Sequence, residues 1–385
     1  MTFRILICDL IGLRLDQHGV PDASEVKAHI EAKGGVFHFG GFEPRETVDD
    51  GKLHFYYLPE LSTAAEILRL TDQSQYDALI AAATFIPADS IFRKGGVRIG
   101  AGTGNMGSKS WGGGNGIGGT APLMNTPGFN AKATAQMTMK SLLRFRPDLG
   151  FDALHARVVA GDFDTGKDLR HFPTAKLEGQ LLAILGYGNI GREVAKLAAA
   201  FGMKIHVFAR AHHHSRIRAD GFNPFETVQA AAQGADVISV HAGLGHLQDG
   251  HFANAGLISA DILGALNRGA TVLNFDRGES VDAEALDQAM TSGQVANAAI
   301  DADIFKSVDG KLSGPMVPYL PLAARYGSRI LLLPHAAADT DHPSRVAGAK
   351  QAVDQIFDAL LNKRITNLKG DLPAGYVSVG LKLGV

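Results

Sequence analysis

The sequence predicts an α/β protein built on two parallel β-sheets. Short apolar runs alternate with amphipathic helical segments along most of the chain, which is the pattern of βα units. The length of 385 residues exceeds what one hydrophobic core usually serves, so two domains are expected. A glycine-rich insert at residues 111–119 interrupts the alternation, and no solenoid repeat is visible.

The elements follow one another in a regular order. Strand candidates of the first part lie at 3–12, 36–42, 76–84 and 96–104, and helix candidates lie at 24–35 and 61–71. After the insert, a Pro-Gly turn leads into a long helix from about Ala131, and a polar loop follows at 161–176. A strand, turn, helix and strand then occupy 179–210. Further strands are expected at 235–243, 269–278, 294–305 and 329–337, before a last helix at 342–364.

Composition and charge narrow the class of partner. Apolar residues make up 45% and charged residues 20% of the chain, and the net charge is −2 without a basic block. Neither nucleic acid nor an anionic membrane is therefore an expected partner. Asp9 interrupts the apolar N-terminal run, which predicts a strand rather than a signal peptide, and no run of about 18 apolar residues exists. The single cysteine, Cys8, excludes an internal disulfide framework and is expected to be a small buried side chain. We expect a cytoplasmic protein.

Three glycine runs satisfy the spacing G-x-G-x-x-G, at 102–107, 114–119 and 186–191. Only the third follows a strand-like run, 181–185, and opens an amphipathic helix, so it alone is expected to hold the pyrophosphate of a dinucleotide. The residues of this turn assigned to the cofactor are Gly186, Gly188, Asn189, Ile190 and Gly191. The run at 114–119 follows no strand, and we interpret the insert, with Trp111, as a flexible flap bearing on substrate choice.

The end of the next strand bears on the choice of cofactor. An acidic residue there would bind the ribose hydroxyls of NAD, but the strand ends in Ala209 and Arg210. An arginine can pair with a 2′-phosphate, so NADP(H) is preferred, with Arg216 as a weaker second ligand. The triple histidine 212–214 is better explained as a loop near the adenosine phosphate than as a metal site, because no further ligand is spaced to join it.

These motifs together resemble the D-isomer-specific 2-hydroxyacid dehydrogenase family. Residues 125–136 are similar to the stretch before its hinge helix, although Gln136 stands where a glutamate is usual. Residues 186–191 resemble its dinucleotide turn, 273–301 its most diagnostic segment, and 334–340 its histidine segment. The resemblance implies two Rossmann-like domains with the active site in the cleft between them. A cofactor domain, 146–336, would be inserted into a flavodoxin-like substrate domain made of 1–145 and 337–385.

The resemblance also implies roles for particular residues. Arg277 would hold the substrate carboxylate and carbonyl, and His335 would be the general acid and base. Asp301 would contact the nicotinamide carboxamide, and His241 would also bind the cofactor. The backbone N–H groups of Thr103 and Gly104 would bind the substrate carboxylate.

One departure from the family concerns the acid that pairs with the histidine. The family has a glutamate a few residues after the position of Asp301, and residues 301–314 contain none. Asp303 and Asp309 are the two candidates to take its place; without such an acid, His335 lacks an acidic partner and its pKa falls.

The leading hypothesis is an oxidoreductase that transfers a hydride between NADP(H) and a small 2-oxo acid or D-2-hydroxy acid, with NAD less favoured. A phosphorylated acid remains an option if Lys109 meets a phosphate. The alternative is a cofactor-sensing, corepressor-like binding protein on the same scaffold, which the missing glutamate favours. A homodimer is implied by the family only.

Overall fold

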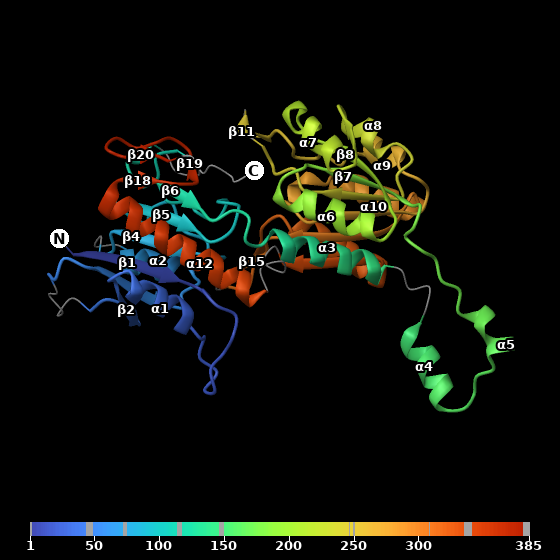
Figure 1. Cartoon of the computed structure of the whole chain (residues 1–385), viewed down its shortest axis with the longest axis horizontal. Coiled ribbons are helices and arrows are strands. Elements are labelled where there is room, and N and C mark those ends of the chain that lie inside the picture. The colour runs from blue at the N-terminus through green and yellow to red at the C-terminus, as the bar shows by residue number, and fades with distance from the viewer. Residues whose placement is uncertain are drawn as a thin grey trace. The chain divides into compact units, whose positions relative to one another are not determined.

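The computed structural model describes residues 2–43, 49–71, 75–113, 118–145, 150–245, 247–248, 251–307, 309–334 and 341–379. The chain divides into two compact units. Unit 1 comprises Met1–Asn130 and Asp339–Val385, and unit 2 comprises Ala131–Ala338. Each unit has a seven-stranded sheet (Figure 1), so the predicted fold class is confirmed. Across the part of the chain just given, no helix is long and apolar enough to cross a membrane.

Unit 1 has the strand order β2-β3-β1-β4-β5-β6-β19, in which every pair is parallel except β6 with β19. Its strands are β1 (Phe3–Cys8), β2 (Val36–Phe39), β3 (Leu53–Leu58), β4 (Ala78–Ala81), β5 (Gly95–Arg98), β6 (Leu123–Asn125) and β19 (Leu368–Lys369), with a small pair, β18 (Arg364–Ile365) and β20 (Val377–Ser378). Its helices are α1 (Ser24–Ala32), α2 (Ala64–Thr71) and α12 (His342–Phe357). In Figure 1 the red helix α12 lies with the blue elements, although it comes from the other end of the chain.

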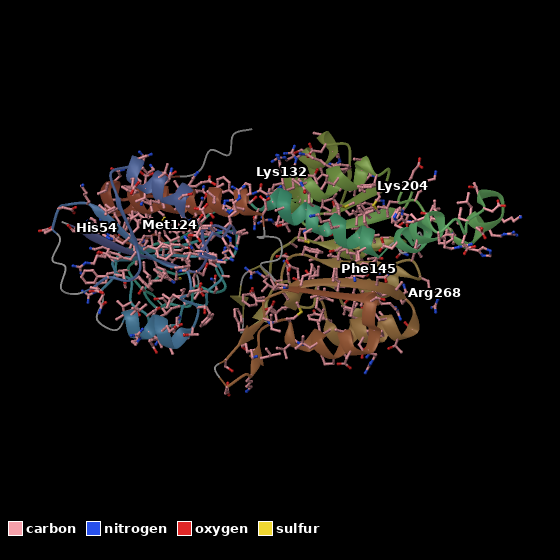
Figure 2. All side chains as sticks on the ribbon, turned by 90° about the horizontal axis from the view of Figure 1, so that it is seen from below. His54, Met124, Lys132, Phe145, Lys204 and Arg268 are labelled. Atoms are coloured by element: carbon pink, nitrogen blue, oxygen red, sulfur yellow. The ribbon has the colours of Figure 1, made fainter. Side chains whose placement is uncertain are left out.

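The two faces of this sheet are covered by different helices. Ile5 and Ile7 of β1 pack with α1 and α12, whereas Leu6 and Cys8 pack with α2 and the segment after β5. This alternation is the two-residue period of a strand buried on both faces. Cys8 is a buried free thiol, as expected. Figure 2 shows Met124 among the packed side chains of this unit.

Strand β3 was missed in the sequence analysis. Its residues, LHFYYL, are almost all buried and mostly aromatic, and they separate β1 from β2. The signal was present as a run of bulky apolar residues, but it is short and has no clear alternation. As a result β2 lies at the edge of the sheet and β3 lies beside β1.

Trp111 belongs to the core of unit 1, which corrects its interpretation as part of a flap. Its side chain is fully buried and stacks on Phe92 with ring centroids 5.9 Å apart. Its Nε1 donates to the carbonyl oxygen of Met106 at 3.1 Å, and the amide of Gly119 donates to its carbonyl oxygen at 2.9 Å. Both ends of the insert are therefore tied down, and 114–117 lie outside the described residues.

Unit 2 has an all-parallel sheet in the order β9-β8-β7-β10-β13-β14-β17. Its strands are β7 (Leu181–Leu185), β8 (Lys204–Phe208), β9 (Asn223–Phe225), β10 (Val237–Val240), β13 (Ala270–Asn274), β14 (Val295–Ala302) and β17 (Ile330–Pro334), with two hairpins, β11 (Leu247–Gln248) with β12 (His251–Phe252) and β15 (Phe305–Lys306) with β16 (Leu312–Ser313). This is the Rossmann order with one added strand, and it reverses between β7 and β10.

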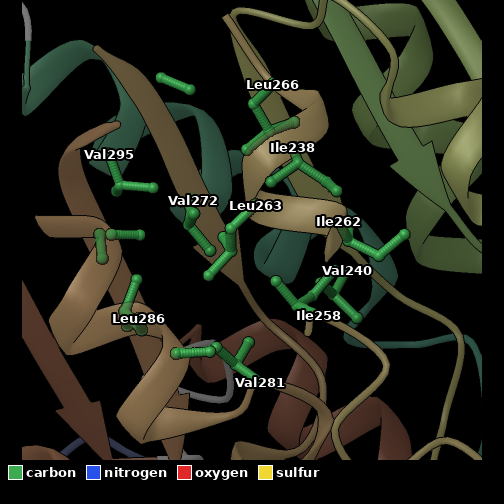
Figure 3. Packing of buried hydrophobic residues seen from close by; sticks show 14 of the residues in the cluster. Ile238, Val240, Ile258, Ile262, Leu263, Leu266, Val272, Val281, Leu286 and Val295 are labelled. Atoms are coloured by element: carbon green, nitrogen blue, oxygen red, sulfur yellow. The ribbon is translucent and has the colours of Figure 1, made fainter. Parts of the chain in front are cut away.

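The helices of unit 2 are α3 (Ala131–Arg144), α4 (Phe151–Val159), α5 (Thr165–Asp168), α6 (Asn189–Ala200), α7 (His214–Ala219), α8 (Val228–Ala232), α9 (Ala260–Ala265), α10 (Ala283–Ser292) and α11 (Leu320–Tyr326). Helices α8 to α11 cover one face of the sheet, where Figure 3 shows Ile238 and Val272 packing with Leu263 and Leu286. Helices α3, α6 and α7 cover the other face.

Helix α3 packs with unit 2. Ala135, Met139 and Leu142 share a buried cluster with Val194 and Ala198 of α6. The first boundary between the units therefore falls before Ala131, whereas the sequence analysis put it after residue 145. The position of this boundary depends on which unit buries the apolar face of α3. The residue pattern of one helix shows that it has an apolar face but not which unit covers that face.

Candidate active site

The turn after β7 gives each of its three glycines a different environment. Gly186 has a positive φ of 100°, and a Cβ there would overlap the carbonyl oxygen of His241. A Cβ on Gly191 would overlap the carbonyl oxygen of Gly186. A Cβ on Gly188 would meet nothing within 4 Å. The turn is thus closed at its first and third glycines and open at the second.

The open glycine lies at the N-terminus of a helix. Gly188 is the N-cap of α6, which begins with Asn189 and Ile190, and both Gly188 and Asn189 are exposed. The first N–H groups of a helix lack partners within it and carry the positive end of its dipole. This arrangement can hold a diphosphate, and the open space above Gly188 lets one approach the backbone.

Basic side chains gather after β8. Among the described residues, the exposed side chains of Arg210 and Arg216 make no hydrogen bond or ion pair. The rings of His212 and His213 lie 4.0 Å apart. Burial lowers the pKa of His213, and the positive charges of its neighbours lower it further. No group of described residues could hold a metal ion, the histidines included.

Asp220, an acid whose pKa the charge of Arg216 lowers, already has partners. Asp220 accepts hydrogen bonds from the Arg192 Nε at 2.7 Å and from the Tyr187 hydroxyl at 2.9 Å. These bonds lower the pKa of Asp220, so the carboxylate is charged and balanced by Arg192. Arg210 and Arg216 are therefore left to attract an anion from solution.

His241 follows β10 and adjoins the glycine turn. Its Nε2 lies 2.8 Å from the Ser239 hydroxyl, and burial lowers its pKa to about 3, so the imidazole is neutral near pH 7. The loop that contains Gly243 is fixed to the segment after β13, because the Asp276 carboxylate accepts the N–H of Gly243. Burial raises the pKa of Asp276.

Arg277 lies directly after Asp276, beyond the carboxyl end of β13. Its backbone carbonyl oxygen accepts the Asn274 Nδ2 at 2.8 Å. Its guanidinium Nη1 lies 3.4 Å from the Asp303 carboxylate, and both side chains are partly exposed. Of the two acids considered as replacements for the missing glutamate, Asp303 therefore contacts Arg277. Asp309 is exposed and accepts a hydrogen bond from Ser307 in the β15–β16 hairpin.

The remaining predicted residues of unit 2 lie at the ends of the last two strands. Asp301 is buried near the end of β14, in register with Leu333 of β17. Strand β17 ends at Pro334, and His335 lies outside the described residues.

The loop after β5 in unit 1 carries Thr103 and Gly104. Arg98 Nε donates to the Asn105 side chain at 3.1 Å, and Gly100 N–H donates to the Thr126 hydroxyl at 2.8 Å. Among the described residues, no acceptor is found for the N–H group of Gly104. The loop is thus held at both ends and can offer a backbone donor to an anion.

Lys109 is not free to bind a phosphate. Its Nζ forms an ion pair with Asp89 at 2.8 Å on the surface of unit 1. Both residues line an open hollow of about 430 Å³ that also includes Arg93 and Thr120.

Three charged residues of unit 1 were missed as site candidates: Asp9, Arg98 and Arg345. Arg98 and Arg345 are buried and Asp9 is half-buried, at the carboxyl edge of the sheet or beside it. An acid directly after a buried strand was the available signal for Asp9. Nothing in the sequence links it to Arg345, which lies near the other end of the chain.

Comparisons with known proteins agree with this architecture. Residues 149–337 match the family model described as D-isomer specific 2-hydroxyacid dehydrogenase, NAD binding domain. The hydroxypyruvate reductase of Thermotoga maritima is 26% identical over 239 residues, which cover 62% of this chain and 70% of that protein. The glyoxylate reductase of Aeropyrum pernix is 29% identical over 256 residues, covering 64% and 68%.

Coverage of other relatives is smaller. The D-3-phosphoglycerate dehydrogenase of Bacillus subtilis is 30% identical over 194 residues, which cover 49% of this chain and only 34% of that protein. The chain thus matches about a third of that relative's length.

Solved structures share the fold across nearly the whole chain. The NAD+-bound 3-phosphoglycerate dehydrogenase of Entamoeba histolytica has a TM-score of 0.66 at 18% identity, covering 96% of this chain and 99% of that chain. An NADPH-dependent glyoxylate/hydroxypyruvate reductase of Sinorhizobium meliloti, in complex with citrate, has a TM-score of 0.63 at 19% identity with the same coverage. With its glycine turn, strand order and matched segment, the chain belongs to the D-isomer specific 2-hydroxyacid dehydrogenase family.

Proposed function

We propose that the protein is an oxidoreductase that interconverts a small 2-oxo acid and its D-2-hydroxy acid with NADP(H). The observation that carries the proposal is the open N-terminus of α6 at Gly188 in a chain that belongs to this family. The bound nicotinamide would supply or accept the hydride at the substrate carbon. The open turn fits the diphosphate of such a cofactor, with Gly186 and Gly191 shaping it and Asn189 and Ile190 beginning the helix.

In this proposal Arg277 and His335 act on the substrate. The Arg277 guanidinium binds the carboxylate and polarises the carbonyl, because a planar fork can donate to two oxygens at once. His335 gives a proton to the carbonyl oxygen in reduction and removes it in oxidation. The N–H groups of Thr103 and Gly104 bind the carboxylate, and Asp301 and His241 contact the cofactor.

Asp303 is the acid that we assign to this reaction. Its contact with Arg277 holds one edge of the guanidinium and leaves the remaining donors for substrate. The role of the family glutamate beside His335 remains a prediction for Asp303, because His335 lies outside the described residues. Asp309 is the weaker candidate, since it bonds within its own hairpin.

The preference for NADP(H) rests on the basic cluster after β8. Arg210 and Arg216 are exposed and unpaired within the described residues, and the Asp220 carboxylate is balanced by Arg192. A 2′-phosphate would satisfy these cations, whereas the uncharged hydroxyl of NAD would not.

We also propose that the protein is a homodimer formed through unit 2. In the segment 151–172, Arg157 pairs with Asp168 at 3.4 Å and lies over Phe163, so the segment is ordered internally. Helix α4 nevertheless buries none of its residues, and Phe151 and Val159 are 75% and 72% exposed. A second copy would cover this apolar surface. The cytoplasmic location expected from the sequence stays a prediction.

The decisive experiment follows the absorbance of NADPH against a broad panel of 2-oxo acids. We expect turnover with at least one acid, a large loss in Arg277→Ala and His335→Ala, and weaker use of NADH. NADPH binding without turnover across the panel would instead favour the cofactor-sensing protein. Equal or better use of NADH would contradict the role of Arg210. For the dimer, Val159→Lys should lower the mass in solution to that of one chain, with the exposed Lys204→Ala as a control.

A further inference from the structure

We propose that unit 1 has an oxyanion-binding site of its own, in which Arg345 is the cation. The ligand is a carboxylate or phosphate oxyanion, supplied either by a group of the substrate or by a free inorganic anion. Only the first source rests on the proposed function, and the site itself is independent of it.

The site lies where the strand order of unit 1 reverses. Strand β1 has β3 on one side and β4 on the other, and ligands of open α/β sheets bind beyond the carboxyl ends at such a point. Asp9 directly follows β1 with a positive φ of 57°, which is uncommon for a residue with a side chain. Its Oδ2 accepts three backbone N–H groups from residues 82–84, at 2.8 to 3.1 Å.

Two buried arginines face this one carboxylate. Burial raises the pKa of Asp9, while Arg345 and Arg98 lower it through their charges, so both cations lie near it. The Arg98 side chain is held in the loop after β5, because its Nε donates to the Asn105 side chain. Its Nη1 lies 2.6 Å from the position that a Cβ on Gly100 would take. The charges of two cations and one anion leave the buried group with one positive charge in excess.

Among the described residues, Arg345 is the cation of this group for which no partner is found. It is 7% exposed, its Nε is buried without a hydrogen-bond partner, and its guanidinium pairs with no described residue. No ion pair joins Arg345 to Asp9 among the described residues. A buried charge without a partner is costly, and an oxyanion would remove the cost.

The surroundings of Arg345 leave room for an oxygen atom. A gap of about 10 Å³ beside it is lined by Gly100, Thr126 and Gly348, which is the space that one oxygen-sized atom needs. A Cβ on Gly348 would stand 3.2 Å from the Thr126 hydroxyl, so a side chain there would narrow the gap. A backbone donor at Gly104 belongs to the same loop as Gly100.

The test uses sulfate as the probe, with calorimetry on the full chain and on two variants of Arg345. We expect saturable sulfate binding that is at least about tenfold weaker in Arg345→Gln, because a charge-assisted hydrogen bond is lost. Arg345→Lys keeps the charge and should retain most of the binding, which separates a lost ligand from a disturbed fold.

The matched control is Arg210→Gln, because sulfate could also bind the basic cluster of unit 2. The proposal would be overturned if Arg210→Gln lost all sulfate binding while Arg345→Gln lost none of it. Equal sulfate affinity in the wild type and Arg345→Gln would overturn it as well.

Kinetics then distinguish the two sources. Sulfate that competes with the 2-oxo acid in the wild type, and no longer in Arg345→Gln, identifies a group of the substrate as the ligand. Sulfate that binds equally well at saturating substrate identifies a free anion. If no acid is turned over, the proposed function fails, but sulfate binding at Arg345 still decides the present inference.

Discussion

The two sheets of this protein turn in the same way after their first strand but use different residues there. Gly186 follows β7 with φ 100°, and Asp9 follows β1 with φ 57°. In unit 2 the turn leads to open space above Gly188. In unit 1 the Asp9 side chain instead bonds the N–H groups after β4. The comparison teaches that the residue after the first strand differs in function between the sheets: a glycine lets the backbone turn closely in unit 2, whereas a carboxylate ties two loops together in unit 1.

The largest effect is expected from removing the Asp9 carboxylate, which holds the edge of the unit 1 sheet. Asp9→Ala leaves three backbone N–H groups without their acceptor, and we expect the free energy of unfolding to fall by about 3 kcal/mol. Asp9→Asn keeps one acceptor oxygen and a tolerance for positive φ, so its loss should be smaller. Denaturant unfolding measures both, and a stability of Asp9→Ala equal to that of the wild type would show that the carboxylate does not hold this edge.

Two glycines of the turn after β7 should have different effects when substituted, one on stability and the other on cofactor binding. Gly191→Ala places a Cβ against the carbonyl oxygen of Gly186 and should lower the free energy of unfolding by about 2 kcal/mol. Gly188→Ala meets nothing in the protein, so it should leave stability unchanged and weaken cofactor binding by about tenfold or more. Thermal unfolding and cofactor titration measure the two effects. Normal cofactor affinity in Gly188→Ala would mean that the open space is not where the diphosphate lies.

A variant of Arg210 should show which of the two cofactors, NADPH or NADH, the open edge of unit 2 binds more tightly. Arg210→Ala should weaken NADPH binding by about tenfold, the value of one charge-assisted contact, and leave NADH binding nearly unchanged. Lys204→Ala, exposed at the start of β8, is the control. A parallel loss for both cofactors would assign Arg210 a structural role instead.

The last prediction concerns how the stability of unit 2 depends on pH. His241 has a pKa of about 3 in the fold against 6.5 for a free histidine, so between these values the unfolded chain binds a proton that the folded chain does not. Stability should therefore fall as the pH is lowered through this window, by at most about 1.4 kcal/mol per pH unit from this group. His241→Gln should flatten that slope in unfolding experiments at several pH values, and an unchanged slope would assign the acid sensitivity to other groups.

Unit 2 was the easier unit to predict. The apolar runs of β7, β10, β13 and β17 and the glycine turn are local patterns, and each appears in the structure close to the expected residues. Local patterns work there because strands buried on both faces need continuous apolar residues. In unit 1, strand β3 was missed although it has a run of bulky, buried residues, because the run is short and includes a histidine.

In the candidate site, too, some features follow from local sequence and others from tertiary contacts. The sequence by itself predicted the glycine turn after β7, because a side chain at Gly186 or Gly191 would overlap a backbone carbonyl oxygen. It also placed Arg277 after a strand, through the family resemblance.

Only the tertiary structure decided what these residues contact. It paired Arg277 with Asp303, buried Trp111 in the core, and brought Arg345 of the last helix near Asp9, which follows the first strand. The physical reason is that backbone conformation depends mainly on neighbouring residues, whereas burial and charge balance depend on residues that only the folded chain brings together.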